Sequence, residues 1–238
     1  MTDLKQTNEK GEIIQFNPEF LPNCQSNYFS PEFWQQRNAI IGSATGRGTT
    51  YFIQTQHHQL VLRHYRRGGM IGKLLSDQYL YLGIESTRAV KEFNLLDKMN
   101  NMGLPAPTPV AYRVRKTGIY YQADLISLKI ENAKDVHHIL QTRPLTESEW
   151  TEIGKTIGLF HQHQIYHHDL NIHNIMLDDM GKVWLIDFDK CAEQSGNAWK
   201  QQNLDRLLRS LKKEKNKIVN FHFEQQDWSF LINSYQAD

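Results

Sequence analysis

Residues 166–177 read YHHDLNIHNIML, and residues 183–189, a few positions further on, read VWLIDFD. The first stretch places an aspartate and two asparagines among histidines and aliphatic residues, and the second ends a short apolar run on Asp187. A carboxylate at the exit of a buried strand needs a polar environment, so we expect it to face a cleft or to bind a cation. Asp169, Asn174 and Asp187 together offer the oxygen ligands that Mg²⁺ prefers.

The segments on either side of these stretches predict a helix that leads into a hairpin. Residues 145–163 read LTESEWTEIGKTIGLFHQH, in which apolar side chains recur at helical spacing and Thr146 with Glu149 forms a capping box. The runs NIML and VWLIDF are short apolar strands joined by the turn DDMGK. The 51 residues after Asp187 are mainly helical in pattern. We therefore expect a helical lobe over residues 130–238.

The first half of the chain predicts a strand-rich lobe, residues 1–129, with one helix. Residues 1–30 are polar with scattered aromatic side chains and are expected to form an irregular N-terminal extension. Strands are expected at 40–53 around a glycine turn, at 59–65 and at 108–126. A helix is expected from Ser86 or Thr87 to about Met102, with Gly103 as its stop.

That helix carries one acidic residue on its inward side. Glu92 falls on the apolar stripe formed by Ala89, Phe93 and Leu96. A carboxylate that faces a core needs a partner, and Arg63 on the preceding strand can supply one. Both a structural salt bridge and a functional ion pair fit this placement.

Together these features resemble the protein kinases and their small-molecule kinase relatives. HHDLNIHN is similar to the catalytic-loop pattern H-R-D-L-x-x-x-N, and IDFD stands in the place of D-F-G. The resemblance implies that Asp169 accepts or orients the acceptor hydroxyl and that Asn174 and Asp187 bind Mg²⁺. It also implies an α+β fold of two lobes, a β-rich N-lobe and a compact helical C-lobe, with ATP in the cleft.

Residues 46–52, GRGTTYF, resemble the glycine-rich loop of these kinases. The resemblance implies that Gly46 and Gly48 let backbone N–H groups approach the phosphates, that Arg63 occupies the place of the strand lysine and that Glu92 is its helical partner. An arginine keeps the positive charge but replaces a point charge by a planar fork.

Three further positions depart from the protein-kinase pattern. His168 replaces the catalytic-loop arginine, Asn171 replaces a lysine and Asp189 replaces the D-F-G glycine. No A-P-E motif follows Asp187, so a peptide-binding lobe does not fit and a protein substrate is not expected. These departures are easier to reconcile with a small-molecule kinase, although those at Arg63 and Asp189 also leave a pseudokinase scaffold open.

Residues 61–75, VLRHYRRGGMIGKLL, and residues 92–110, EFNLLDKMNNMGLPAPTPV, are similar to the lipopolysaccharide-core sugar kinases of Gram-negative bacteria. This resemblance covers nearly the whole chain. It implies ATP-dependent phosphorylation of the 4-hydroxyl of 3-deoxy-D-manno-octulosonic acid (Kdo) on a glycolipid, a lipid A precursor (Kdo-lipid IVA), in lipopolysaccharide core biosynthesis. A heptose kinase of the same core or another small-molecule kinase, such as an antibiotic kinase, would use the same catalytic residues.

A glycolipid substrate implies contact with a membrane surface. Arg66, Arg67 and Lys73 form a basic patch suited to lipid A phosphates or anionic headgroups. An apolar face able to dip into the membrane interface is expected from Met70, Ile71, Leu74, Leu75, Tyr79 and Leu82. A basic loop beside a buried helix explains the same residues. We expect a peripheral protein on the cytoplasmic side of the bacterial inner membrane.

The net charge, the cysteine count and the positions of the histidines bear on the other possible functions. The formal net charge of +1 argues against bulk nucleic-acid binding, and two cysteines far apart in sequence favour a reducing compartment. A zinc or nickel site is the competing non-enzymatic interpretation, because five of the eleven histidines fall at His161, His163, His167, His168 and His173. Against it, no cysteine accompanies them, and two of them lie two residues apart on a predicted helix.

Overall fold

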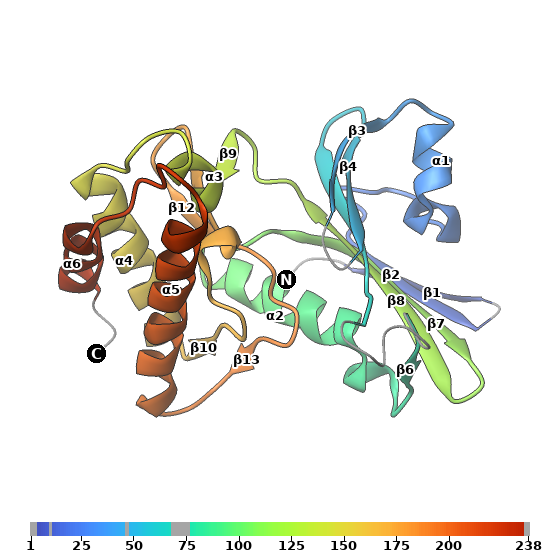
Figure 1. Cartoon of the computed structure of the whole chain (residues 1–238). Helices are drawn as coiled ribbons and strands as arrows, with labels where there is room; N and C mark the ends of the chain where they lie inside the picture. Colours follow the sequence, from blue (N-terminus) through green and yellow to red (C-terminus); the bar gives the residue numbers. More distant parts are fainter. Residues whose placement is uncertain (1–3, 10, 46–47, 68–76, 236–238) are drawn as a thin grey trace. The chain divides into compact units, whose positions relative to one another are not determined.

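The computed structural model describes residues 4–9, 11–45, 48–67 and 77–235 (Figure 1). The chain divides into two compact units, one formed by Met1–Asp97 with Thr108–Lys129 and the other by Lys98–Pro107 with Ile130–Asp238. The first carries a large antiparallel sheet and the second is mainly helical, so the predicted kinase-like α+β class is confirmed. In the part of the chain that the structure describes, no helix has the length and apolar composition needed to cross a membrane.

The sheet of the first unit joins segments that are far apart in sequence. Its strands follow the order β1-β2-β7-β8-β5-β4-β3, with β6 beside β8, and Figure 1 shows the blue β1 and β2 against the green β7 and β8. The strands are β1 (Lys5–Glu9), β2 (Glu12–Phe16), β3 (Ile40–Thr45), β4 (Thr49–Gln54), β5 (Gln59–His64), β6 (Tyr79–Leu80), β7 (Pro109–Thr117) and β8 (Tyr120–Leu128). The strands expected at 40–53, 59–65 and 108–126 are confirmed.

The prediction that residues 1–30 form an irregular extension is wrong. Strands β1 and β2 pair antiparallel, and β2 continues the sheet by pairing Ile14 with Arg113 of β7. Ile14 and Phe16 are 4% and 5% exposed and belong to the core of this unit. The turn between the two strands uses Gly11 at φ +80°, a conformation that favours glycine. Because every residue of β1 is polar, and residues 5–8 are exposed, its sequence lacks the alternation that signals a strand.

Helix α2 (Arg88–Asn101) contributes residues to both units and ends where the sequence predicts. Ala89, Phe93 and Leu96 are buried, and Gly103 adopts φ +74° just beyond the helix, as a C-terminal glycine stop requires. The shorter helical segments of the first unit are η1 (Ser26–Phe29), α1 (Pro31–Gln35) and η3 (Ile84–Ser86).

The second unit surrounds a small sheet with helices. Strands β9, β11 and β12 form this sheet, in which β11 pairs antiparallel with both neighbours, and β10 pairs with β13. The elements are β9 (Ala133–Asp135), α3 (Val136–Leu140), α4 (Glu147–Gln162), β10 (Ile165–Tyr166), η4 (Ile172–Asn174), β11 (Ile175–Asp178), β12 (Val183–Leu185), β13 (Ala192–Glu193), α5 (Ala198–Lys217) and α6 (Gln225–Ser234). The predicted hairpin, the capping box at Thr146 and the C-terminal helices are confirmed.

Helices α4 and α6 approach each other closely because α4 has a glycine at the contact. A Cβ placed on Gly154 would lie 2.2 Å from the carbonyl oxygen of Leu231 and 2.2 Å from the hydroxyl of Ser234. No real side chain tolerates such distances, so Gly154 sets how closely α6 docks. This docking gives α4 a firm support from which the chain enters β10 and the HHDLNIHN segment.

Candidate active site

The HHDLNIHN segment is a loop held together by its own asparagines. It leaves β10 at Tyr166 and re-enters regular structure at η4. The backbone carbonyl of Asp169 accepts hydrogen bonds from the side-chain amides of Asn171 and Asn174, each at 2.9 Å. These two bonds fix the backbone at Asp169, while its carboxylate lies on the half-exposed side of the loop.

Asn174 and Asp187 are connected through one intervening residue of the hairpin. The amide of Ile186 donates to the carbonyl of Asn174 at 3.0 Å, and Ile186 directly precedes Asp187. The buried ring of His167 donates from Nε2 to the Ile186 carbonyl at 3.0 Å, and burial lowers the pKa of His167, which keeps the ring neutral. The loop and the hairpin therefore hold each other through the backbone beside Asp187.

Asp187 itself has a strained backbone. Its φ is +63°, a left-handed conformation that few residues other than glycine adopt. Such a conformation persists only where the surroundings impose it, and strained residues cluster at functional sites. Aspartate adopts this conformation more readily than most residues, and Lys190 shares it at φ +63°, so the chain turns sharply on both sides of residues 188–189.

The donors on these elements fit Mg²⁺ chemically. Asp187 supplies a carboxylate, and the side chain of Asn174 uses its nitrogen toward Asp169, so its amide oxygen is the atom available to ligate a cation. Mg²⁺ takes oxygen ligands from a few carboxylate or amide groups and completes its shell with water and phosphate. The residues present thus match the cofactor that the sequence resemblance implies.

The carboxylate of Asp169 has a charged partner that the sequence did not predict. Arg206, on α5, places Nη1 2.9 Å from Oδ1 of Asp169, and both side chains are about half exposed. Nearby on α5, Asn203 donates to the carbonyl of His167 at 3.1 Å, and the hydroxyl of Ser210 accepts from the amide of Ile172 at 3.0 Å. One face of α5 therefore contacts the HHDLNIHN segment repeatedly.

In the first unit, Arg63 and Glu92 form the predicted ion pair. Nη2 of Arg63 contacts Oε2 of Glu92, and the hydroxyl of Tyr65 donates to the same oxygen at 2.7 Å. Glu92 is buried, whereas the Arg63 side chain is a quarter exposed. Arg63 lies on β5 between β4 and β8, so the sheet fixes its base while Glu92 fixes its head group. Tyr65 is a partner that sequence reasoning missed.

The predicted phosphate loop is described only in part. Gly46 lies outside the described residues, while Gly48 directly precedes β4. A Cβ placed on Gly48 would lie 3.0 Å from Cδ of Arg66, which is a tight but adjustable contact because Arg66 is flexible.

The predicted membrane-facing residues are only partly where the sequence suggested. Lys73 and the apolar residues Met70, Ile71, Leu74 and Leu75 lie outside the described residues. The inclusion of Tyr79 is wrong, because this residue is 8% exposed and its hydroxyl accepts a hydrogen bond from Arg88. Leu82, by contrast, is 72% exposed.

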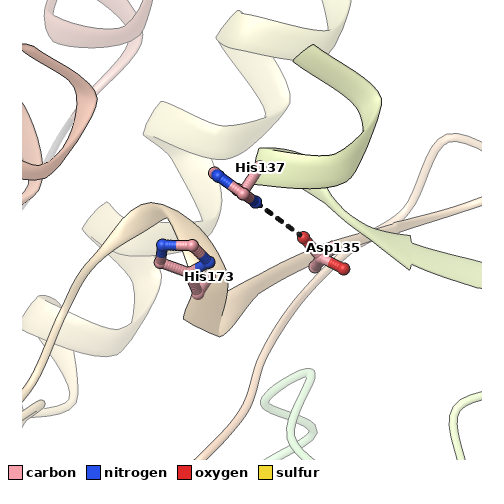
Figure 2. Close-up of side chains that lie close together, drawn as sticks. All are labelled: Asp135, His137 and His173. Carbon is pink, nitrogen blue, oxygen red and sulfur yellow. Dashed lines mark ion pairs between the residues drawn. The ribbon is translucent and has the colours of Figure 1, made fainter. Parts of the chain in front are cut away.

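The histidine cluster suggested by the sequence does not form. His161 contacts the hydroxyl of Tyr235 and His167 contacts Ile186. Among the described residues, the one group of His, Cys, Asp or Glu side chains that could hold a metal ion contains His173 together with Asp135 and His137 (Figure 2). Only one of the five predicted histidines takes part, and its neighbours come from elsewhere in the chain.

Comparisons with known proteins agree with this architecture. Residues 31–235 match the Lipopolysaccharide kinase (Kdo/WaaP) family. The chain is 47% identical to a 3-deoxy-D-manno-octulosonic acid kinase of Vibrio parahaemolyticus serotype O3:K6, covering 97% of each chain. It is 45% identical to a protein of the same name from Haemophilus influenzae strain PittEE, covering 98% of this chain and 99% of the relative. The protein therefore belongs to the lipopolysaccharide kinase (Kdo/WaaP) family.

Proposed function

We propose that this protein transfers the γ-phosphate of ATP to the 4-hydroxyl of Kdo on a lipid A precursor, Kdo-lipid IVA. The observation that carries the proposal is the near-complete alignment with 3-deoxy-D-manno-octulosonic acid kinases. Support comes from the loop and hairpin that hold Asp169, Asn174 and Asp187 on linked backbone segments.

In this proposal Asp169 is the catalytic residue. Its carboxylate orients the sugar hydroxyl toward the phosphate and takes up the hydroxyl proton late in the transfer, because the transition state is loose and needs little base strength. Arg206 holds that carboxylate in one orientation before the sugar binds. The oxygen attack is direct, so no covalent intermediate with the protein is expected.

The remaining site residues bind the nucleotide. Arg63, held by Glu92 and Tyr65, presents its guanidinium to the phosphates and neutralises part of their charge. Gly46 and Gly48 allow backbone N–H groups to approach the same phosphates. Asn174 and Asp187 would hold Mg²⁺, which when bound neutralises charge on the transferring phosphoryl group.

The decisive experiment identifies the product. Purified protein is incubated with ATP, Mg²⁺ and Kdo-lipid IVA, and mass spectrometry of the fragmented lipid locates the added phosphate. We expect one phosphate on the Kdo residue, and we expect Asp169→Ala to lower the rate by about 10²–10⁴-fold, the usual contribution of a positioned acid or base.

Asp179→Ala is the matched control, because Asp179 is an exposed carboxylate in the hairpin turn and should leave the rate unchanged. If a heptose-containing core glycolipid is offered in parallel, phosphate found only on its heptose residue would replace Kdo by the alternative sugar. Absence of transfer to any core glycolipid by the wild-type protein would refute the enzyme function.

We further propose that the protein contacts the inner-membrane surface through three exposed apolar residues of the first unit. Leu80, Leu82 and Ile119 are 52%, 72% and 64% exposed, and the backbone amide of Tyr81 donates to the Ile119 carbonyl at 2.9 Å, which brings them together. The ammonium of Lys116 lies 4.9 Å from the ring centroid of Tyr81. An apolar patch beside a cation suits an anionic lipid surface.

Vesicle flotation tests this contact. Wild-type protein should float with vesicles that contain phosphatidylglycerol, and the double variant Leu82→Ser/Ile119→Ser should bind them roughly tenfold or more weakly, since each buried aliphatic side chain contributes about 1.5 kcal/mol or more. Val219→Ser is the control, because Val219 is 87% exposed on the second unit. Equal loss in the control would contradict the assignment of this patch.

A further inference from the structure

Two histidine rings and two carboxylates meet in the second unit, apart from the residues assigned to catalysis. The rings of His137 and His173 lie with their centroids 4.0 Å apart. Asp135, His137 and His173 each offer one ligand atom within 4.8 Å of the others, as Figure 2 shows for their side chains. Glu214, on α5, lies beside both rings.

The two sides of the histidine pair are chemically different. Nδ1 of His137 lies 3.9 Å from Oδ1 of Asp135 and 3.1 Å from the side-chain nitrogen of Gln141. Because that amide nitrogen can only donate, Nδ1 of His137 is an acceptor, and its lone pair is directed at Gln141 with the carboxylate of Asp135 next to it. An acceptor nitrogen of a neutral imidazole is the form that ligates a metal.

On the other side, both rings direct Nε2 toward one carboxylate. Nε2 of His137 lies 3.6 Å from Oε2 of Glu214, and Nε2 of His173 lies 3.9 Å from Oε1 of the same residue. Nε2 of His137 is buried and has no hydrogen-bond partner at the present distances. Metal-binding histidines usually donate their second N–H to a carboxylate, which fixes the tautomer and raises the basicity of the ligand. Glu214 is placed for this role toward both rings.

We propose that Asp135, His137 and His173 form a binding site for Zn²⁺ or a similar divalent transition metal. The ligands are Nδ1 of both imidazoles and the carboxylate of Asp135, with Glu214 as acceptor for both Nε2–H groups. Imidazole ligands select this class of ion over Mg²⁺, which takes oxygen ligands.

The three ligand atoms lie within 4.8 Å of one another and must move closer together to bind an ion. Bonds of about 2.0–2.2 Å place the ligand atoms of a tetrahedral zinc site about 3.4 Å apart. Nδ1 of His137 lies 3.9 Å from Oδ1 of Asp135, and Gln141 is exposed and can move away from Nδ1. Oδ1 of Asp135 also accepts from the amide of His138 at 2.8 Å, which caps α3 and leaves Oδ2 for the metal.

The ion would join three segments that are remote in sequence. Asp135 and His137 lie at the start of α3, His173 lies in η4 and Glu214 lies near the end of α5. Because η4 also carries Asn174, an occupied site would restrain the end of the HHDLNIHN segment. Three protein ligands leave a fourth position that a water molecule would fill.

Metal binding to the full-length protein, free of any histidine tag and stripped with a chelator, tests the proposal. We expect calorimetry to show one Zn²⁺ bound per chain without nucleotide, and Co²⁺ to give the visible absorption of a tetrahedral site. His137→Ala and His173→Ala should each abolish stoichiometric binding, and Glu214→Gln should weaken it about 10–100-fold, as loss of an outer carboxylate does.

The neighbouring exposed residues provide matched controls. His138→Ala, on the same helix as His137, and His163→Ala should bind Zn²⁺ like the wild type. Zn²⁺ should also raise the Tm of the wild-type protein but not that of His173→Ala, whose half-exposed ring is not needed for the core. Failure of the wild type to bind one equivalent, or retained binding in His173→Ala, would overturn the proposal. Neither result depends on kinase activity.

Discussion

At the scale of single residues, the pair Arg206 and Asp169 stands out. The sequence places Asn171 where protein kinases have a lysine beside the catalytic aspartate, and the structure supplies a cation from α5 instead. The contact is a single hydrogen-bonded ion pair in partial contact with solvent. Such pairs contribute little to folding stability, typically 0.2–1 kcal/mol at about this exposure. We therefore infer that this ion pair orients the Asp169 carboxylate and adds little to the free energy of unfolding.

We predict that Arg206→Ala lowers kcat by about tenfold to a hundredfold with little change in Tm, because a misplaced catalytic group costs up to about 10²-fold. The measurement is steady-state phosphate transfer together with thermal unfolding. Arg209→Ala is the control, since Arg209 is an exposed arginine on the same helix. Equal kcat values for the two variants would show that Arg206 does not position Asp169.

Sequence reasoning found some of these residues and missed others for definable reasons. Asp169, Asn174 and Asp187 follow a fixed spacing within one short segment, so their pattern is visible in the sequence alone. Glu92 was visible because a carboxylate interrupts an apolar stripe, and its contact with Arg63 is confirmed. Arg206 lies far from Asp169 in sequence and on an ordinary charged helix face, so only the fold reveals the contact.

At the scale of elements, helix α5 holds the HHDLNIHN segment through four of its side chains. Asn203, Arg206, Ser210 and Glu214 are spaced by three or four residues and so lie on one face of the helix. In that order they contact His167, Asp169, Ile172 and His173. In the sequence this polar helix face resembles a solvent-exposed surface, but in the structure its side chains bind the loop and hold its conformation.

The strands differ in how well their sequences predict them. Strand pairs with clear alternation, such as β7 and β8, were predicted close to their observed bounds. Strand β1 is polar at every position, and it is a strand because β2 offers it a free edge to pair with. Edge strands owe their conformation to a neighbour rather than to their own apolar pattern, so a single sequence gives little warning of them.

At the scale of the whole molecule, buried neutral histidines make the fold sensitive to acid. His161 is 1% exposed, and burial lowers its pKa to about 4, although the neighbouring side chain of Asn203 acts in the opposite direction. In the unfolded chain its pKa is about 6.5. Between these two values the unfolded state binds more protons, so the free energy of unfolding falls as the pH falls.

We predict that the free energy of unfolding decreases by about 2 kcal/mol between neutral pH and about pH 5 through His161 alone, from the shift of its pKa. Urea unfolding of the second unit, followed by tryptophan fluorescence at both pH values, measures this change. In His161→Gln the decrease should shrink by about that amount, whereas His163→Gln, at an exposed position, should behave like the wild type. Identical pH dependence in both variants would contradict the assignment to His161.

The repeated contacts of α5 also limit which insertions and deletions the gene can accept within this helix. An α-helix turns by about 100° per residue, so one codon inserted between Asn203 and Glu214 would rotate every later contact residue away from the loop. Substitutions on the outer face of α5 leave its contacts intact, whereas a single-residue insertion or deletion would separate Arg206 from Ser210 and Glu214 in register. The length of this helix is therefore under tighter constraint than its composition.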